Sequence, residues 1–271
     1  MNRIDSRFAE LKITRRKALI PFITAGDPSL EASVPVMHAL VAAGADVIEL
    51  GVPFSDPMAD GPTIQRSSER ALVRGVGTTQ VFDMVRAFRA TDATTPIVLM
   101  GYLNPVVIRG VERYAQEAHA AGVDGVLLVD LPPEEAAEIR TIFNAHALAL
   151  IALAAPTTSE PRLARLAREA QGYLYYVSFA GVTGASRIDT GSVLERVAAL
   201  RAQAAAPVVV GFGVKDAATA AALAPCADGV VVGSALVEAI AQAADSDAAA
   251  HRATAFLAPL RAALDATAVS A

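Results

Sequence analysis

Short apolar runs alternate along the chain with longer segments in which apolar residues recur at helical spacing. Each run is followed by a polar or glycine-rich turn and then by an amphipathic segment. In one such segment, Leu163, Leu166, Ala167 and Ala170 follow at offsets of three, four and seven. This order of strand, turn and helix is typical of parallel sheets. The eight predicted strands lie at 18–24, 47–50, 97–101, 125–129, 147–153, 173–177, 208–211 and 229–232.

Eight strand–helix units predict a (β/α)8 barrel, the TIM-barrel fold of the α/β class. A doubly wound sheet usually has about five or six strands and a glycine fingerprint after its first strand, and that fingerprint is missing after 18–24. We expect a leading helix at about 2–11, a closing helix at about 249–264, and a long loop after the second strand, at 54–77, that holds an extra helix. No linker divides the chain, so we interpret residues 1–271 as a single catalytic domain.

Composition narrows the class of protein. The chain has 23 basic and 28 acidic side chains, a formal net charge of -5, no tryptophan and only 5% aromatic residues. Nucleic-acid surfaces need basic and stacking side chains, so we expect no nucleic-acid partner. No apolar run reaches about 18 residues and the first seven residues carry charges, so we expect a cytoplasmic protein without a membrane segment. The single cysteine, Cys226, excludes an intramolecular disulfide and is interpreted as a buried small residue.

An acidic residue interrupts the second apolar run. Strand alternation places Val47, Glu49 and Gly51 on one face, so Glu49 points into the barrel mouth if Ile48 and Leu50 pack outward. A carboxylate there would be partly desolvated, which raises its pKa toward the range of a general acid or base. The alternative is a structural acid paired with an arginine. Barrel active sites are built at these strand ends, which favours the catalytic interpretation.

The loop that follows carries two further carboxylates, Asp56 and Asp60, over the same mouth. Its prolines and glycine limit its flexibility while leaving it able to close as a lid. Taken alone, the two aspartates are ordinary turn residues. Paired with Glu49, one of them would complete a catalytic site with two carboxylates.

Glycine-rich turns follow the sixth, seventh and eighth predicted strands, at 181–184, 211–213 and 233–234. Glycine leaves backbone N–H groups unobstructed, and Ser234 opens a helical stretch whose N-terminus offers further donors. In barrels this corner is the common phosphate site. We therefore expect a phosphorylated substrate, with ordinary tight turns as the alternative.

Two other chemistries have weaker support. The histidines at 38, 119, 146 and 251 lack metal-ligand spacing, so we expect no metal site. Lys215 lies near the end of the seventh strand, which keeps a Schiff-base aldolase open, although it lies in a turn at a predicted helix start. The residues alone therefore indicate a cofactor-free barrel enzyme that handles a small phosphorylated substrate by carboxylate acid–base catalysis.

The segment from Glu49 to Gln65, ELGVPFSDPMADGPTIQ, closely resembles the signature of the tryptophan synthase alpha chain family. Further similarity, in the family's order and spanning nearly the whole chain, lies in PFITAGDP, MGYLNP, DLP, GVTG and GFG, which begin at residues 21, 100, 130, 181 and 211. The resemblance implies retro-aldol cleavage of indole-3-glycerol phosphate to indole and glyceraldehyde 3-phosphate, a step of L-tryptophan biosynthesis. Departures are Met58 where leucine is usual, Val129 where proline or alanine is common, and Phe179 and Ala180.

By this resemblance, Glu49 is the principal acid–base residue: it protonates the indole ring at C3 and assists proton removal from the side-chain hydroxyl. Asp60 accepts a hydrogen bond from the indole N–H. Protonation at C3 leaves a cationic indolenine, whose charge a nearby carboxylate stabilises, so no external electron sink is needed. The implied substrate-binding residues are Phe22, Met100, Leu127 and Tyr175 at the indole, Thr183 in a mobile loop, Gly184, Gly213, Gly233 and Ser234 at the phosphate, and Phe212.

The resemblance also implies a partner. Family members work with a beta chain that carries pyridoxal phosphate and receives indole through a tunnel in an α2β2 complex, while the alpha chain itself holds no cofactor. The loops around Asp56 and around Asn104 and Pro105 face that partner in the family. Stand-alone relatives release free indole, so a stand-alone lyase remains an alternative. A regulatory subunit with vestigial activity is another, against which the intact pair Glu49 and Asp60 argues.

Overall fold

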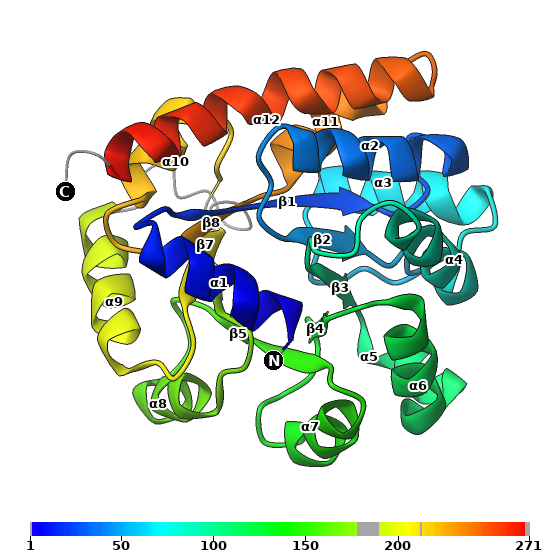
Figure 1. Ribbon diagram of the computed structural model, residues 1–271. Coiled ribbons are helices and arrows are strands. Elements are labelled where there is room, and N and C mark those ends of the chain that lie inside the picture. Colours follow the sequence, from blue (N-terminus) through cyan, green and yellow to red (C-terminus); the bar gives the residue numbers. More distant parts are fainter. Residues whose placement is uncertain (1, 178–189, 212, 269–271) are drawn as a thin grey trace.

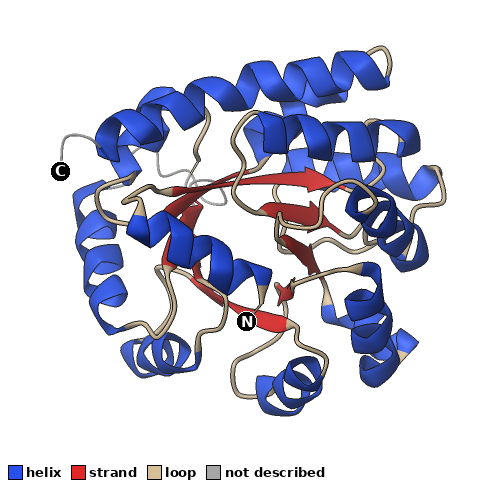
Figure 2. Cartoon of the chain, viewed as in Figure 1, coloured by secondary structure: helices blue, strands red, loops and turns tan. Residues whose placement is uncertain are grey.

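Eight parallel strands form a closed barrel in which each strand pairs with its neighbours in sequence and β8 pairs with β1. The computed structural model describes residues 2–177, 190–211 and 213–268. The strands occupy the centre and the helices surround them (Figures 1 and 2). The predicted (β/α)8 barrel is therefore confirmed. The strands are β1 (Ala18–Thr24), β2 (Ile48–Gly51), β3 (Ile97–Gly101), β4 (Gly125–Leu128), β5 (Ala149–Ala154), β6 (Leu174–Val177), β7 (Val208–Gly211) and β8 (Gly229–Val232).

The helices of the described residues include several beyond one per strand. The extra helix expected in the loop after the second strand is present as α3, and α5 after β3 was not expected. The leading and closing helices extend a few residues beyond the predicted bounds. The helices are α1 (Arg3–Ile13), α2 (Leu30–Ala42), α3 (Pro62–Val73), α4 (Thr78–Arg89), α5 (Leu103–Arg109), α6 (Val111–Ala121), α7 (Ala136–Ala145), α8 (Glu160–Glu169), α9 (Thr190–Gln203), α10 (Ala217–Leu223), α11 (Ser234–Ala241) and α12 (Ser246–Ala268).

Two apolar clusters divide the core. The larger lies between the outward faces of the strands and the helices, where Leu19, Ile48 and Leu50 are fully buried. The smaller cluster fills the barrel interior and consists of every second residue along the strands, for example Val47 and Val98. Alternation along β2 thus packs Ile48 and Leu50 outward, as the prediction for Glu49 requires. None of the helices in the described part of the chain is both long and apolar enough to cross a membrane.

Helix α1 closes the N-terminal end of the barrel. It lies across the starts of the strands in Figure 1, and its buried residues Ile4, Phe8 and Leu11 belong to the interior cluster. Asn2 caps the helix by accepting a hydrogen bond from the N–H of Ile4. The interior is therefore packed at its base, and only the opposite end is left for a site.

Three aspartates tie the base of the barrel together. Asp46, Asp124 and Asp228 precede β2, β4 and β8, and each accepts a hydrogen bond from a backbone N–H of a neighbouring strand at 2.8–2.9 Å. Each is also paired with arginine, which offsets the cost of removing the carboxylate from water. The N–H donors are those of Leu19, Ile97 and Val208, and the arginines are Arg7 and Arg261, Arg3 and Arg89, and Arg201, respectively.

Candidate active site

Glu49 lies on β2 with no solvent exposure and points into the barrel interior. The Tyr173 hydroxyl, which lies just before β6, donates a 2.6 Å hydrogen bond to Glu49 Oε1. The second oxygen, Oε2, is buried and has no hydrogen-bond partner among the described residues. Burial raises the pKa of Glu49 to about 7, although the Tyr173 hydrogen bond opposes the rise. The carboxyl group is thus poised to gain or lose a proton near neutral pH.

Asp60 lies at the end of the loop after β2, just before Gly61, the N-cap of α3. The Tyr102 hydroxyl donates to Asp60 Oδ2 at 3.0 Å and accepts the N–H of Ala59 at 3.0 Å, so one phenol fixes two consecutive residues of the loop. Phe54 stacks on the Tyr102 ring with 5.0 Å between centroids. Burial raises the pKa of Asp60, and the Tyr102 hydrogen bond lowers it by less.

Phe22 forms one wall of the site on β1, directly opposite Glu49 in the β1–β2 register. A Cβ on Gly51 would come within 2.5 Å of Phe22 Cζ, so glycine at this position makes room for the ring. A Cβ on Gly233 would lie 3.5 Å from Phe22 Cβ. The ring therefore lies between the strand of Glu49 and the start of α11, where the resemblance implies that the phosphate binds.

The other predicted indole residues line the barrel interior. Leu127 and Tyr175 belong to the interior cluster and Met100 packs against it, half-buried. A Cβ on Gly211 would come within 2.0 Å of the Tyr175 hydroxyl, so this glycine leaves the space that the phenol occupies. The structure thus places these four apolar side chains, Phe22 included, on the inner face of the strands, on the same face as Glu49.

The predicted phosphate corner is described in part. Gly213 is exposed with φ of +49°, and Gly233 and Ser234 begin α11 as N-cap and first residue. Gly233 caps the helix without a side chain, which leaves the first N–H groups of α11 free of a side-chain cap. Free N–H groups and the positive end of the helix dipole suit a phosphate. Thr183, Gly184 and Phe212 lie outside the described residues.

The residues considered for a Schiff base or a metal site lie away from the two carboxylates. Lys215 is exposed and precedes Asp216, which caps α10, so its ammonium is in water and not in the barrel. Within residues 2–177, 190–211 and 213–268, no group of three or more His, Cys, Asp or Glu is arranged to hold a metal ion.

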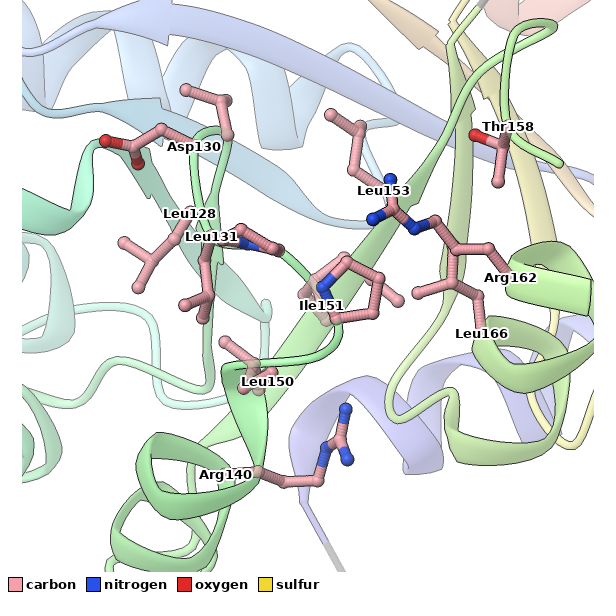
Figure 3. A pocket seen from close by; sticks show the side chains of 15 residues that line it. Leu128, Asp130, Leu131, Arg140, Leu150, Ile151, Leu153, Thr158, Arg162 and Leu166 are labelled. Atoms are coloured by element: carbon pink, nitrogen blue, oxygen red, sulfur yellow. The ribbon is translucent and has the colours of Figure 1, made fainter.

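A cavity of about 310 Å³ lies beside the mouth, between the segments that follow β4 and β5 (Figure 3). Arg140 and Arg162 reach it from α7 and α8, and Asp130 lies on the far side from Arg162. Both arginines are paired, with Glu169 at 2.7 Å and with Glu134 at 2.9 Å. The rest of the wall is mostly apolar, and neither Glu49 nor Asp60 lines this cavity. It is therefore a side cavity and not the carboxylate site.

Sequence reasoning missed the two tyrosines that hold the carboxylates. Tyr173 precedes β6 and shares the face of Tyr175 by alternation, which was the available signal. Tyr102 directly follows β3, and only the three-dimensional path of the loop brings Asp60 to it. Neither residue has a distinctive sequence spacing relative to Glu49 or Asp60.

The closed barrel, with a buried carboxyl group and a second carboxylate over its mouth, defines a class of protein: a (β/α)8-barrel enzyme equipped for acid–base chemistry. Residues 8–265 match the family described as "Tryptophan synthase alpha chain". The chain therefore belongs to the tryptophan synthase alpha chain family, and its activity is the lyase half-reaction of that family, the cleavage of indole-3-glycerol phosphate.

Individual relatives agree over nearly the full length. A tryptophan synthase alpha chain of Xanthomonas axonopodis pv. citri (strain 306) is 72% identical over 266 residues, which is 98% of this chain and 99% of the relative. A crystal structure of tryptophan synthase subunit alpha from Legionella pneumophila str. Paris has a TM-score of 0.91 and 46% identity, covering 98% and 99% of the two chains. A structure of Mycobacterium tuberculosis tryptophan synthase has a TM-score of 0.87 and 39% sequence identity, and the match covers 97% of this chain and 98% of the other.

Proposed function

We propose that Glu49 and Asp60 are the catalytic residues of the lyase half-reaction. The observation that carries this proposal is the buried Glu49 carboxyl group, which has a pKa of about 7, one free oxygen and no cationic partner among the described residues. A structural acid would be expected to have an arginine, as Asp46 does. A group with this pKa can both give and take a proton at neutral pH.

The reaction then needs no electron sink beyond its own substrate. Glu49 donates a proton to C3 of the indole ring and gives a cationic indolenine. The hydroxyl on the adjacent side-chain carbon loses its proton, its C–O bond becomes the carbonyl of glyceraldehyde 3-phosphate, and the electrons of the breaking C–C bond return to the ring as indole. One proton enters and one leaves, so Glu49 can serve both steps. We propose that this chain holds no cofactor of its own for this step.

Asp60 is proposed to accept a hydrogen bond from the indole N–H and to stabilise the positive charge of the protonated ring. Its partial burial supports this role, because a carboxylate acts on a nearby charge more strongly where water is scarce. Tyr102 holds the Asp60 side chain and the preceding N–H, and is proposed as its positioning residue.

The remaining contacts follow the same logic. Phe22, Met100, Leu127 and Tyr175 are proposed to contact the indole ring, since they share the inner face with Glu49. The phosphate is proposed to bind at the start of α11, with Thr183 and Phe212 as further substrate-binding residues. The proposed phosphate positions are Gly184, Gly213, Gly233 and Ser234.

A beta chain that carries pyridoxal phosphate is the proposed partner, in an α2β2 complex that receives the indole. Exposed apolar side chains next to the mouth support such a contact: Met58 is 87% exposed in the loop after β2, and Val107 and Ile108 are 54% and 78% exposed on α5. We also propose that residues 1–271 act as one catalytic domain and that the enzyme is cytoplasmic.

Indole release tests this function directly. The purified chain is incubated with indole-3-glycerol phosphate, alone and with a beta chain, and free indole or tryptophan is measured. We expect slow cleavage alone and faster cleavage with the partner. Cleavage that a beta chain leaves unchanged would favour a stand-alone lyase, and no cleavage in either case would overturn the proposal.

Borohydride trapping separates this mechanism from that of a Schiff-base aldolase. Borohydride reduces an imine between Lys215 and a carbonyl substrate to a stable adduct, which mass spectrometry detects. The exposed position of Lys215 favours no adduct, and a stoichiometric adduct on this residue would exclude the carboxylate mechanism.

A further inference from the structure

A second cavity, of about 930 Å³, lies at the N-terminal end of the barrel, opposite the mouth. It opens between the end of α1, the segment before β1, and the regions where α9 and α10 lead into β7 and β8. Its apolar wall includes Phe8, Leu11, Pro207 and Pro225. Its volume is in the range of sites that bind small organic molecules.

Positive charge is concentrated around this cavity, although the chain as a whole has a net charge of -5. Two of the three lysines of the chain line it. The carboxylate of Asp228 also lines it, so cations exceed anions on its wall. The cationic lining residues are Lys12, Arg15, Arg16, Lys17 and Arg201.

Some of these charges are already neutralised. Arg201 pairs with Asp228 at 2.7 Å, and Arg16 pairs with Asp265 at 3.0 Å. The half-buried Lys17 donates to the backbone carbonyl of Ala227 at 2.7 Å and forms no ion pair with a carboxylate of the described residues. Burial lowers the pKa of Lys17, the positive charge of Arg201 lowers it further, and the negative charge of Asp228 partly opposes both.

The side chains of Lys12 and Arg15 have no hydrogen bond or ion pair to another described residue. Together with Lys17, they leave three cations without a carboxylate partner on one wall. Like charges on one wall repel one another, and an anion shared between them would relieve that repulsion.

The backbone at Arg15 carries a further cost. Helix α1 ends in a pair of hydrogen bonds, from Arg15 N–H to the Lys12 carbonyl and from Arg16 N–H to the Leu11 carbonyl. In this helix ending the residue with positive φ is usually glycine, and here it is Arg15, with φ of 55°. A strained position that keeps an exposed cation without a partner points to a role for that cation.

The dipole of α1 offers a simpler explanation for some of the cations that line the cavity. Cations are favourable near a helix C-terminus, which covers Lys12, Arg15 and Arg16. It does not account for Lys17, which leads into β1. Arg201 lies in the last turn of α9, where the dipole of that helix favours it. The ends of two helices and the segment before β1 therefore bring cations to one cavity, which holds more positive charge than either helix dipole alone accounts for.

We propose that this cavity binds a small soluble anion that carries two phosphates on an organic group, of the nucleoside diphosphate type. Lys12, Arg15 and Lys17 would contact the phosphates, and the apolar wall around Phe8 and Pro225 would contact the organic part. The site is at the opposite end of the barrel from Glu49 and does not depend on the lyase reaction.

Calorimetric titration of the full chain with ADP and with pyrophosphate tests the proposal. Each titration is run without and with saturating glycerol 3-phosphate, because the mouth is expected to take a phosphate of its own. We expect one binding event per chain, tighter for ADP than for pyrophosphate, and weaker as sodium chloride is raised. Absence of binding, or loss of binding when glycerol 3-phosphate is added, overturns the proposal.

The Arg15→Gly variant separates binding from folding. Glycine suits the positive φ at this position, so thermal stability is expected to stay equal or to rise, while the affinity for ADP falls at least about fivefold. The matched control is Arg168→Gln, which removes an exposed arginine of α8 that also has no partner among the described residues. An affinity that Arg15→Gly leaves unchanged, or that the control lowers equally, overturns the assignment.

Discussion

The two ends of the barrel treat buried carboxylates in opposite ways. At the base, Asp46 is fully buried and has arginine partners on two helices as well as a backbone N–H donor. Near the mouth, Glu49 is equally buried and has one phenol donor and one oxygen without a partner. Asp46 lies just before β2 and Glu49 lies on it, three positions further along the chain.

This difference explains how one chain uses buried carboxyl groups both to stabilise the fold and to transfer protons. A cation beside a buried carboxylate favours the charged form and fixes its position. Without a cation, burial favours the neutral form, and the pKa of Glu49 rises to about 7. The carboxylates at the base are therefore held by arginines, whereas the carboxyl group near the mouth can exchange a proton.

The largest expected effect is on catalysis at Glu49. Glu49→Gln keeps the shape and the hydrogen bond from Tyr173 but cannot exchange a proton, so the rate of indole release should fall at least about a hundredfold. The rate of indole release is measured at saturating substrate for both chains. A variant within a few fold of the parent chain would contradict the catalytic role.

Asp46→Asn tests the other side of the comparison. Removing the charge leaves Arg261, which is 6% exposed, with Asp265 as its one remaining carboxylate among the described residues, so the free energy of unfolding should fall by about 2 kcal/mol. Urea unfolding measures this change. The rate of the folded enzyme should stay within a few fold, and a hundredfold loss of rate with intact stability would refute the division of roles.

The pH dependence of stability gives a third test. The folded pKa of Glu49 lies above its usual value of 4.5, so folding binds a proton. The resulting stability is fully present below about pH 4.5 and is lost as pH rises through about 7. Above pH 7, Glu49→Gln should therefore be more stable than the parent chain by about 3 kcal/mol, and the difference should vanish near pH 4.5.

Urea unfolding of both chains from pH 4.5 to 8.5 measures this difference. Asp46→Asn is the control, because it removes a carboxylate that is paired with arginines and should be less stable than the parent chain throughout that range. A stability difference between Glu49→Gln and the parent that does not change with pH would contradict the raised pKa.

The smallest expected effect is at the positioning residue of the loop. Tyr102→Phe removes the donor to Asp60 and the acceptor for the Ala59 N–H, so the turnover rate should fall roughly tenfold. Steady-state kinetics measure the turnover rate and KM separately. Tyr176→Phe is the matched control, because the buried Tyr176 hydroxyl has no hydrogen-bond partner among the described residues. Equal losses in the two variants would sink the positioning role.

The strands and their inward faces were predictable because alternation along β2 and β6 follows directly from residue order. Glu49 was found for the same reason, as a polar residue on an apolar inward face. Tyr102 was not found, because its partner Asp60 comes to it through a loop whose path depends on tertiary contacts. The extra helix α5 was missed because its seven residues are too few to show a helical period.

Because α1 closes the base of the barrel, it limits the routes by which substrate can enter and products can leave. Ile4, Phe8 and Leu11 fill the end of the barrel opposite the mouth, so among the described residues the packed interior offers no axial exit. The substrate must then enter through the mouth of the barrel, and both products must leave through the same opening. A protein surface that covered the mouth would therefore lie in the path of both products.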